Sequence, residues 1–314
     1  MTRKLFSTLL CALSLLLLMG AGFAPEEENA AVKHGRVLAT KSQTILKSSV
    51  QATPAAAAVG PLKFATEMER DLLVDGMYVP AKVMLTRKEG VSYVALANMA
   101  RIMDKNALVS WDHASQTVTV TAGELTMTAQ VGEFYLEANG RYLYLPGQVQ
   151  MEDNRVMVPL WAVVKAFDAT MTWNAKNETI SVTRGSGAIQ SGEDFYDEET
   201  LFWLSRIIYA ESGNQSTEGQ MSVGTVVMNR VGDPTFGYTI QEVLAQKNQF
   251  STYDSGRLAD RTPNASSVIA AKLVLDGGVV EETKDALYFD SNAGSWAARN
   301  KEYVATIGNH KFYS

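Results

Sequence analysis

The chain has 314 residues, which is enough for about two domains, and 46% of them are hydrophobic and 20% charged. This composition is typical of globular proteins and excludes a chain that is disordered throughout, a collagen and a multi-span membrane protein. With 28 Lys and Arg against 34 Asp and Glu, the formal charge is −6. An acidic chain lacks the Lys/Arg-rich face that offsets phosphate charge, so we expect no nucleic-acid partner.

The first 24 residues have the pattern of a secretory signal peptide. Arg3 and Lys4 precede an apolar run over residues 9–19, and small residues follow up to Ala24. The run is shorter than the roughly 20 residues of a membrane span, although an uncleaved N-terminal anchor is the alternative. We therefore predict a signal peptide at 1–24, a secreted or wall-located protein, and no stable membrane anchor after signal cleavage.

The segment after the signal peptide shows no apolar periodicity. Residues 25–61 are rich in Ala, Ser, Thr and Lys, which predicts a flexible linker. Cys11 is the only cysteine and lies within the signal peptide. The mature protein therefore has no thiol for a disulfide, a nucleophile or a metal site.

Residues 62–184 contain an internal repeat. Each unit is predicted to contain a strand, a short helix (96–103 or 160–167), a Trp, a turn and a closing β-branched strand. A unit this small buries little surface alone, so we expect the two units to share one core. The matched segments are Tyr93-Val94-Ala95-Leu96 with Met157-Val158-Pro159-Leu160, Trp111-Asp112 with Trp173-Asn174, and 117–121 with 179–183.

At these residues the segment resembles the copper amine oxidase N-terminal-like domain, a module of exported Gram-positive proteins. The resemblance implies a small α+β stalk domain without copper chemistry. His113 has no second metal ligand near it in the sequence, so no metal site is expected. We expect Trp111 and Trp173 to be core residues, with sugar stacking as the alternative. Residues 185–196, which contain several Gly and Ser, are predicted to be a second linker.

Residues 197–314 form the predicted catalytic domain, and Glu211 is its candidate catalytic residue. Leu204 and Ile207 belong to the apolar stripe of the first helix, and Glu211 continues that stripe near the helix C-terminus. Burial and the negative end of the helix dipole both raise the pKa of such a carboxyl group, which can then act as a general acid. The alternatives are pairing with Arg206 or Arg230, or exposure to solvent.

The remaining signals predict a helix-rich domain with a small β element, so the chain as a whole is expected to be α+β. Thr217 and Gln220 have the spacing of a capping box before an apolar, central helix. A second such box, at Thr239 and Glu242, begins a short third helix. Near the C-terminus, Gly308-Asn309 suits the two-residue turn of a hairpin.

Several separated motifs of this domain resemble the catalytic domain of bacterial spore cortex-lytic enzymes and related cell wall hydrolases. The resemblance implies a lysozyme-like helical core, cleavage of the glycan strands of peptidoglycan, no cofactor, and Glu211 as the single catalytic acid. The stalk-like repeat replaces the helical wall-binding module that the family carries upstream, so spore cortex and vegetative wall both stay open as substrates. The motifs are Ile207-Ile208-Tyr209-Ala210-Glu211, Glu218-Gly219-Gln220, Val226-Val227-Met228-Asn229-Arg230, Gln249-Phe250-Ser251, Ala286-Leu287-Tyr288-Phe289 and Ile307-Gly308-Asn309-His310-Lys311-Phe312.

The resemblance also implies the residues that bind substrate. Aromatic faces would stack on sugar rings, and amide and hydroxyl groups would bind acetamido and hydroxyl groups of the glycan. For some of these residues a structural role is the alternative: core packing for Tyr288, turn formation for Asn309, a buried hydrogen-bonded imidazole for His310, and an ion pair for Arg230. The full set is Tyr209, Asn229, Arg230, Phe250, Ser251, Tyr288, Trp296, Asn309 and His310.

One candidate carboxylate favours a lytic transglycosylase, because this mechanism needs a single acid that later acts as the base. Glu211 would protonate the MurNAc–GlcNAc oxygen, and the muramic C6 hydroxyl would then close a 1,6-anhydro ring. A hydrolytic muramidase needs a second acid, for which Glu218, Asp233 and Asp254 are the candidates. A non-catalytic wall-binding protein is the alternative from another class. An amidase is disfavoured, since no zinc-ligand set or nucleophile–base pair is visible.

Overall fold

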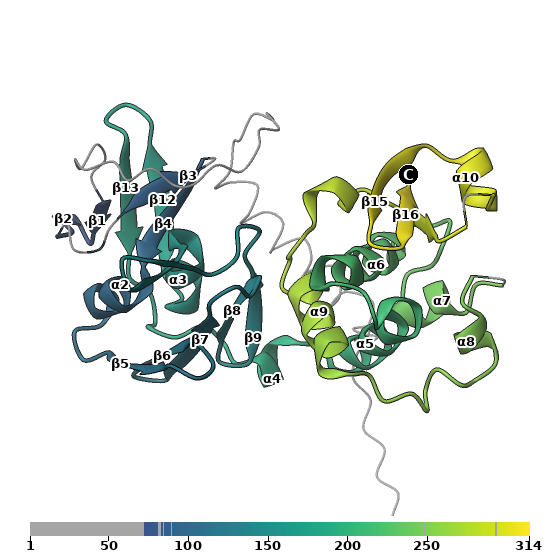
Figure 1. Cartoon of the computed structure of the whole chain (residues 1–314), viewed down its shortest axis with the longest axis horizontal. Coiled ribbons are helices and arrows are strands. Elements are labelled where there is room, and N and C mark those ends of the chain that lie inside the picture. Colours follow the sequence, from purple (N-terminus) through teal and green to yellow (C-terminus); the bar gives the residue numbers. More distant parts are fainter. Residues whose placement is uncertain (1–71, 81–82, 84, 89, 248, 293) are drawn as a thin grey trace, which may run out of the picture.

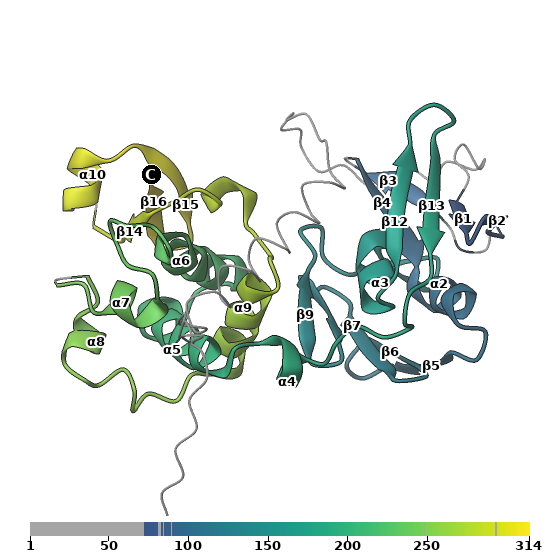
Figure 2. The ribbon, with the colours of Figure 1, turned by 180° about the vertical axis from the view of Figure 1, so that it is seen from behind.

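The computed structural model of the chain describes residues 72–314 apart from 81–82, 84, 89, 248 and 293. A β-rich N-terminal domain lies beside a helical C-terminal domain that carries a small sheet, as Figures 1 and 2 show. The α+β class is therefore confirmed. The predicted signal peptide and first linker lie outside the described residues. None of the helices described is both long and apolar enough to cross a bilayer.

The described part of the N-terminal domain consists of three sheets and two short helices. The sheets have the strand orders β12-β13-β1-β2, β10-β11-β4-β3 and β5-β6-β7-β8-β9. The elements are β1 (Leu72–Val74), β2 (Met77–Tyr78), β3 (Thr86–Lys88), β4 (Val91–Ala95), α2 (Leu96–Met103), β5 (Leu108–Asp112), β6 (Thr117–Ala122), β7 (Leu125–Gln130), β8 (Tyr135–Ala138), β9 (Arg141–Tyr144), β10 (Gln150–Glu152), β11 (Arg155–Pro159), α3 (Leu160–Ala166), β12 (Thr170–Asn174) and β13 (Thr179–Thr183).

The two repeats meet at their equivalent strands. β4 and β11 pair in antiparallel register, and Val94 lies directly opposite Val158, its counterpart in the other repeat. Both valines are fully buried in one hydrophobic cluster, to which each repeat contributes its helix and its closing strand. The expectation that the repeats share a core is confirmed.

The two tryptophans of the repeats are less buried than expected. Trp173 is 43% exposed, and the guanidinium group of Arg87 lies 4.4 Å from its ring centre. Trp111 is partly buried and donates a 3.0 Å hydrogen bond to Nδ1 of His113. The prediction of a core position is wrong for Trp173, because β12 is an edge strand whose side chains are mostly exposed.

The C-terminal domain is built around α6, whose apolar side chains are buried as predicted. This helix packs against α5, α9 and the small sheet β14-β16-β15. The elements are α4 (Gly192–Phe195), α5 (Glu198–Ser212), α6 (Thr217–Arg230), α7 (Ile240–Leu244), α8 (Ser251–Asp254), α9 (Ala265–Leu275), η2 (Glu281–Thr283), β14 (Tyr288–Asp290), α10 (Trp296–Asn300), β15 (Tyr303–Ile307) and β16 (His310–Tyr313).

Side-chain caps fix where these helices begin. The capping box of Thr239 and Glu242 is confirmed at the start of α7. For α6 the prediction was one residue late, because the hydroxyl of Ser216, rather than Thr217, accepts from the main-chain N–H of Gly219. A cap satisfies an N–H group that has no partner within the helix, and it is worth about 1 kcal/mol.

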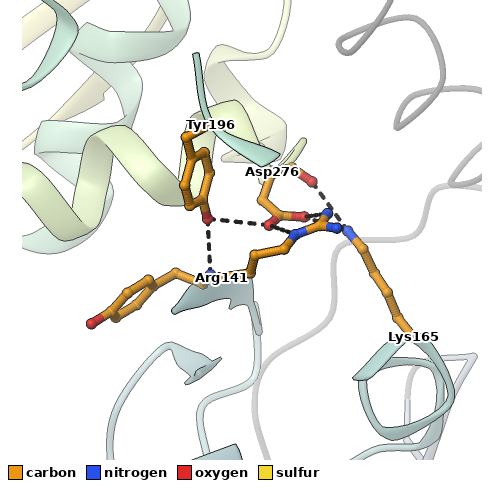
Figure 3. A network of polar contacts seen from close by, with 5 residues as sticks. Arg141, Lys165, Tyr196 and Asp276 are labelled. Carbon is orange, nitrogen blue, oxygen red and sulfur yellow. Dashed lines mark hydrogen bonds and ion pairs between the residues drawn. The ribbon is translucent and has the colours of Figure 1, made fainter. Parts of the chain in front are cut away.

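The two domains contact each other through β9 and α9. Asp276, the residue after α9, has a nearly inaccessible side chain and accepts two 2.8 Å hydrogen bonds from Arg141 of β9. Lys165 of α3 donates to the same carboxylate at 2.5 Å, and the Tyr196 hydroxyl donates at 3.2 Å. Figure 3 shows these side chains converging on Asp276 from separate elements. Burial alone would raise the pKa of Asp276, but the Arg141 hydrogen bonds and the Lys165 charge lower it.

Further contacts extend this interface. The Tyr144 hydroxyl donates to Glu218 at 3.1 Å, and the Tyr144 ring is buried in the hydrophobic cluster of the C-terminal domain. Gly192 of α4 lies so close to Gly140 that a Cβ atom would be 2.5 Å from the Gly140 carbonyl oxygen. The segment 185–196, predicted as a linker, therefore contains a helix that takes part in the domain contact.

Candidate active site

Glu211 lies at the C-terminal end of α5, one residue before the helix ends. Leu204 and Ile207 on the same stripe are fully buried, and Glu211 itself is partly buried, as the apolar spacing predicts. Gly213 is the C-cap of the helix, and no larger residue fits there, because a Cβ atom would lie 2.6 Å from the Tyr209 ring and carbonyl oxygen. The carboxyl group is thereby held at the helix end, where the pocket begins.

A pocket of about 210 Å³ lies between α5, α6, α8 and the small sheet. Four of the predicted site residues line it: Glu211, Arg230, Phe250 and His310. Four further residues line it that were not selected from the sequence: Gln249, Phe289, Asp290 and Ser291. Two carboxyl groups, a guanidinium group, an imidazole, an amide and a hydroxyl group thus meet beside two phenyl rings.

The surroundings of Glu211 favour its protonated form. Burial raises the pKa of its carboxyl group above the usual value of 4.5, and the positive charge of Arg261 partly offsets this effect. No ion pair involves Glu211 among the residues that the structure describes. A carboxyl group that keeps its proton nearer to neutral pH is suited to general acid catalysis.

The two arginines proposed as ion-pair partners of Glu211 contact other groups. Arg206 donates to the carbonyl oxygens of Phe202 and Ala259. Arg230, the last residue of α6, is 3% exposed and donates to the Leu287 carbonyl at 2.7 Å and to Gln249 Oε1 at 3.2 Å. Burial lowers the pKa of Arg230 to about 10, which leaves the group charged at neutral pH.

Aromatic rings surround the buried guanidinium group of Arg230. Its central carbon lies 4.8 Å from the ring centre of Phe236, 5.3 Å from that of Tyr288 and 5.6 Å from that of Phe250. Such cation–π contacts replace part of the hydration that burial removes. Arg230 therefore stays in one place and ties the end of α6 to the strand β14 and to Gln249.

His310 begins β16 and is buried against the aromatic core. Its ring meets Phe289 edge-on, with the ring centres 5.3 Å apart, and its Nδ1 has no hydrogen-bond partner among the described residues. Burial lowers the pKa of His310, and the nearby carboxylate of Asp290 partly opposes this effect. The imidazole is therefore biased toward its neutral form, in which it is a donor at one nitrogen and an acceptor at the other.

The other six predicted site residues lie outside the pocket lining. The amide of Asn229 donates to the carbonyl oxygens of Lys284 and Ala286, and Asn309 occupies the predicted hairpin turn between Ile307 and His310. Trp296 is 56% exposed, and its ring centre lies 5.7 Å from that of Tyr288. Ser251 directly follows Phe250 of the lining, and Tyr209 lies two positions before Glu211 in α5. The substrate-binding roles of Tyr209, Asn229, Ser251, Tyr288, Trp296 and Asn309 stay predictions.

The three acids considered for a second catalytic carboxylate also lie elsewhere. Glu218 accepts from Tyr144 at the domain interface, Asp233 accepts from the main chain of Thr235 in a turn, and Asp254 ends α8. The second carboxylate in the pocket lining is Asp290. In the sequence, Asp290 directly follows the Tyr288-Phe289 motif. Within the described residues, no three His, Asp or Glu are placed to hold a metal ion.

Comparison with known proteins gives matches for both domains. Residues 214–313 match the family model described as Cell Wall Hydrolase, and residues 73–182 match the Copper amine oxidase N-terminal domain. The chain is 28% identical over 121 residues to a spore cortex-lytic enzyme of Bacillus cereus, covering 37% of this chain and 45% of that protein. A spore cortex-lytic enzyme of Oceanobacillus iheyensis is 24% identical over 142 residues, with coverages of 41% and 50%. The chain spans about half the length of the curated relatives it matches.

Two solved structures are similar to part of the chain. The catalytic domain of the germination-specific lytic transglycosylase SleB from Bacillus anthracis is 25% identical, with 40% of this chain and all of that chain covered and a TM-score of 0.35. The catalytic domain of the Bacillus cereus SleB protein is 26% identical. Here 38% of this chain and 92% of that chain are covered, and the TM-score is 0.34. The family matches agree with both resemblances drawn from the sequence. The chain thus combines a segment that matches the Copper amine oxidase N-terminal domain with a C-terminal segment that matches the Cell Wall Hydrolase family.

Proposed function

We propose that this protein is exported and cleaves the glycan strands of bacterial wall peptidoglycan, with Glu211 as the catalytic acid. The observation that carries the proposal is the partly buried carboxyl group of Glu211, which has a raised pKa and lies in a pocket with polar donors. The curated relatives named as spore cortex-lytic enzymes support a wall substrate.

The reaction that we favour is a lytic transglycosylation. Glu211 donates its proton to the glycosidic oxygen between MurNAc and GlcNAc, and the C1–O bond breaks. The carboxylate then takes the proton of the muramic C6 hydroxyl, whose oxygen bonds to C1 and closes the 1,6-anhydro ring. The proton lost from Glu211 is thereby restored, so one carboxyl group completes the cycle. A raised pKa suits both steps, because the group is a usable acid and, once ionised, a stronger base.

A hydrolytic muramidase is the second candidate, and Asp290 is the observation that favours it. Hydrolysis normally uses two carboxylates, of which the second activates water or attacks the sugar. Asp290 lines the pocket with Glu211, and its Oδ1 accepts a 2.7 Å hydrogen bond from the main chain of Asn292. The two reactions differ in their products, which makes them separable.

The test is digestion of purified sacculi by the full chain and by Glu211→Gln. The proposal expects soluble muropeptides with 1,6-anhydro-muramic ends in mass spectrometry, and at least about a 100-fold loss of rate in the variant. Reducing muramic ends would select the muramidase instead. Sacculi that bind the protein without releasing fragments, or equal rates for Glu211→Gln and the parent, would contradict an enzyme and favour a wall-binding protein.

A further inference from the structure

The side-chain amide of Gln249 is oriented by Arg230. Nη1 of Arg230 donates a 3.2 Å hydrogen bond to Oε1 of Gln249, and a guanidinium group can only donate. The oxygen end of the amide must therefore face Arg230, and the Nε2 end, with two N–H groups, faces away from it. No partner for Nε2 occurs in the part of the chain that the structure describes, and Gln249 lines the pocket that contains Glu211.

The position of Arg230 is fixed independently of Gln249. Its Nε donates to the Leu287 carbonyl oxygen at 2.7 Å, and the side chain is almost inaccessible to solvent. Rings from Phe236, Phe250 and Tyr288 enclose the guanidinium group. Because these contacts already restrict the side chain of Arg230, it loses little further conformational entropy when it binds Gln249. Arg230 can therefore hold the amide of Gln249 in one orientation.

The groups beside Gln249 complement an N-acetyl group. An acetamido substituent has a carbonyl oxygen that accepts hydrogen bonds and a methyl group that is apolar. Gln249, which is exposed, lines this pocket together with Phe250 and Phe289. The amide donors of Gln249 would bind the oxygen, and the partly exposed ring of Phe289 would contact the methyl group.

We propose that Gln249 binds the acetamido carbonyl of a wall sugar in the pocket of Glu211 and that Arg230 acts as its positioning residue. This inference rests on the proposed function and adds the substrate feature that the site selects. It makes the N-acetylated glycan the preferred substrate, and it predicts that glycan carrying free amino groups is cleaved poorly.

The test compares the full chain with Gln249→Glu on matched soluble glycan strands. Strands are freed of their stem peptides and used N-deacetylated or re-acetylated with acetic anhydride. The carboxylate of Gln249→Glu still accepts from Arg230 but offers no N–H donor. We expect the parent to prefer acetylated strands about tenfold in kcat/KM, and the variant to lose about tenfold on these strands and almost all of the preference.

Gln241→Glu is the matched control, because it makes the same change in α7 of the same domain, outside the pocket lining. It should keep the preference of the parent. Arg230→Lys keeps the charge but cannot hold the amide in the same way, so it should reduce the preference through KM while the pH dependence set by Glu211 is unchanged. An equal loss of rate on both strand types would mean a general disturbance of the site and would contradict the positioning role.

Other outcomes separate this inference from the proposed function. If the parent cleaves wall but treats both strand types alike, or if Gln249→Glu keeps the preference, the acetamido assignment is overturned and the enzyme proposal stands. If the loss in Gln249→Glu occurs only on strands that carry stem peptides, the ligand is a peptide carbonyl and the assignment is also overturned. If the parent cleaves no wall glycan of any kind, the proposed function itself has failed.

Discussion

Arg141 and Asp276 lie 135 positions apart in the sequence, and the arginine donates two 2.8 Å hydrogen bonds to the aspartate across the domain boundary. Their side chains are 8% and 1% exposed. Lys165 binds the same carboxylate, so one buried anion holds two cations that come from the other domain. Removing one partner of such a cluster leaves a buried charge without compensation, which costs more than the cluster gains when it is complete.

Asp276→Asn should therefore destabilise the protein strongly. The amide cannot neutralise Arg141 and Lys165, and we expect a loss of about 3–5 kcal/mol in the free energy of unfolding. Urea denaturation followed by circular dichroism measures this loss. Asp260→Asn, an exposed position in the same domain, should change the free energy by less than about 0.5 kcal/mol. Equal, small effects of both substitutions would show that the buried cluster does not hold the domains together.

Glu211→Gln should stabilise the protein in a pH-dependent way. The pKa of Glu211 is raised by folding, so the folded state holds its proton to higher pH than the unfolded state does. As the pH rises from the pKa of Glu211 in the unfolded state through its pKa in the folded state, ionisation of this group increasingly destabilises the folded protein. The amide side chain of Glu211→Gln does not ionise and avoids this cost. The melting temperature of the variant should exceed that of the parent at pH 7 and match it below about pH 4. A difference that is the same at every pH would contradict the raised pKa.

Arg261→Gln should move the pH dependence of activity. The positive charge of Arg261 lowers the pKa of Glu211, so its removal raises that pKa further. The alkaline limb of kcat/KM, where the acid loses its proton, should shift to higher pH, and added salt should weaken the difference between variant and parent. Arg257→Gln, also exposed on the segment before α9, is the control and should leave the limb in place. If the alkaline limb of kcat/KM does not shift in Arg261→Gln, a group other than Glu211 determines its position.

Asp290→Asn separates the two candidate reactions. A transglycosylase with one carboxyl group should keep its anhydro products, because Asp290 takes no proton in that mechanism. A muramidase should lose at least about 100-fold in rate. The variant should also lower the pKa of His310 further, since the carboxylate of Asp290 now raises it. Product analysis by mass spectrometry and an NMR titration of His310 measure the two effects, and an unchanged imidazole titration would contradict the proximity of the pair.

Local patterns in the sequence were enough to predict much of the fold. The helix over Leu96–Met103 and the strand over Thr179–Thr183 have the predicted bounds. Such elements are determined by the apolar spacing or the β-branched residues of the segment itself. The two-residue turn before His310 was predicted for the same reason. Glu211 could be selected because its helical spacing relates it to Ile207 and Leu204, which lie only four and seven positions away.

Contacts between distant segments could not be predicted in this way. Asp276 and Arg141 carry no pattern that relates them, and Trp173 is exposed because its strand lies at the edge of a sheet, which depends on strand order. Gln249 and Asp290 reach the pocket of Glu211 through loops and strand pairing that bring α8 and β14 to the end of α5. The sequence motifs contained or adjoined both residues, but no single-sequence signal distinguished them from their neighbours.

The pairing of Val94 with Val158 has a consequence for how this domain arose. Because equivalent residues face each other in antiparallel strands, the two halves are related locally by a twofold axis, as in an isologous homodimer. A chain with one half alone would leave β4 as an open edge, and a second copy of that chain could cover it with the same register. Duplication and fusion of such a self-associating ancestor would convert an intermolecular contact into the present covalent tandem.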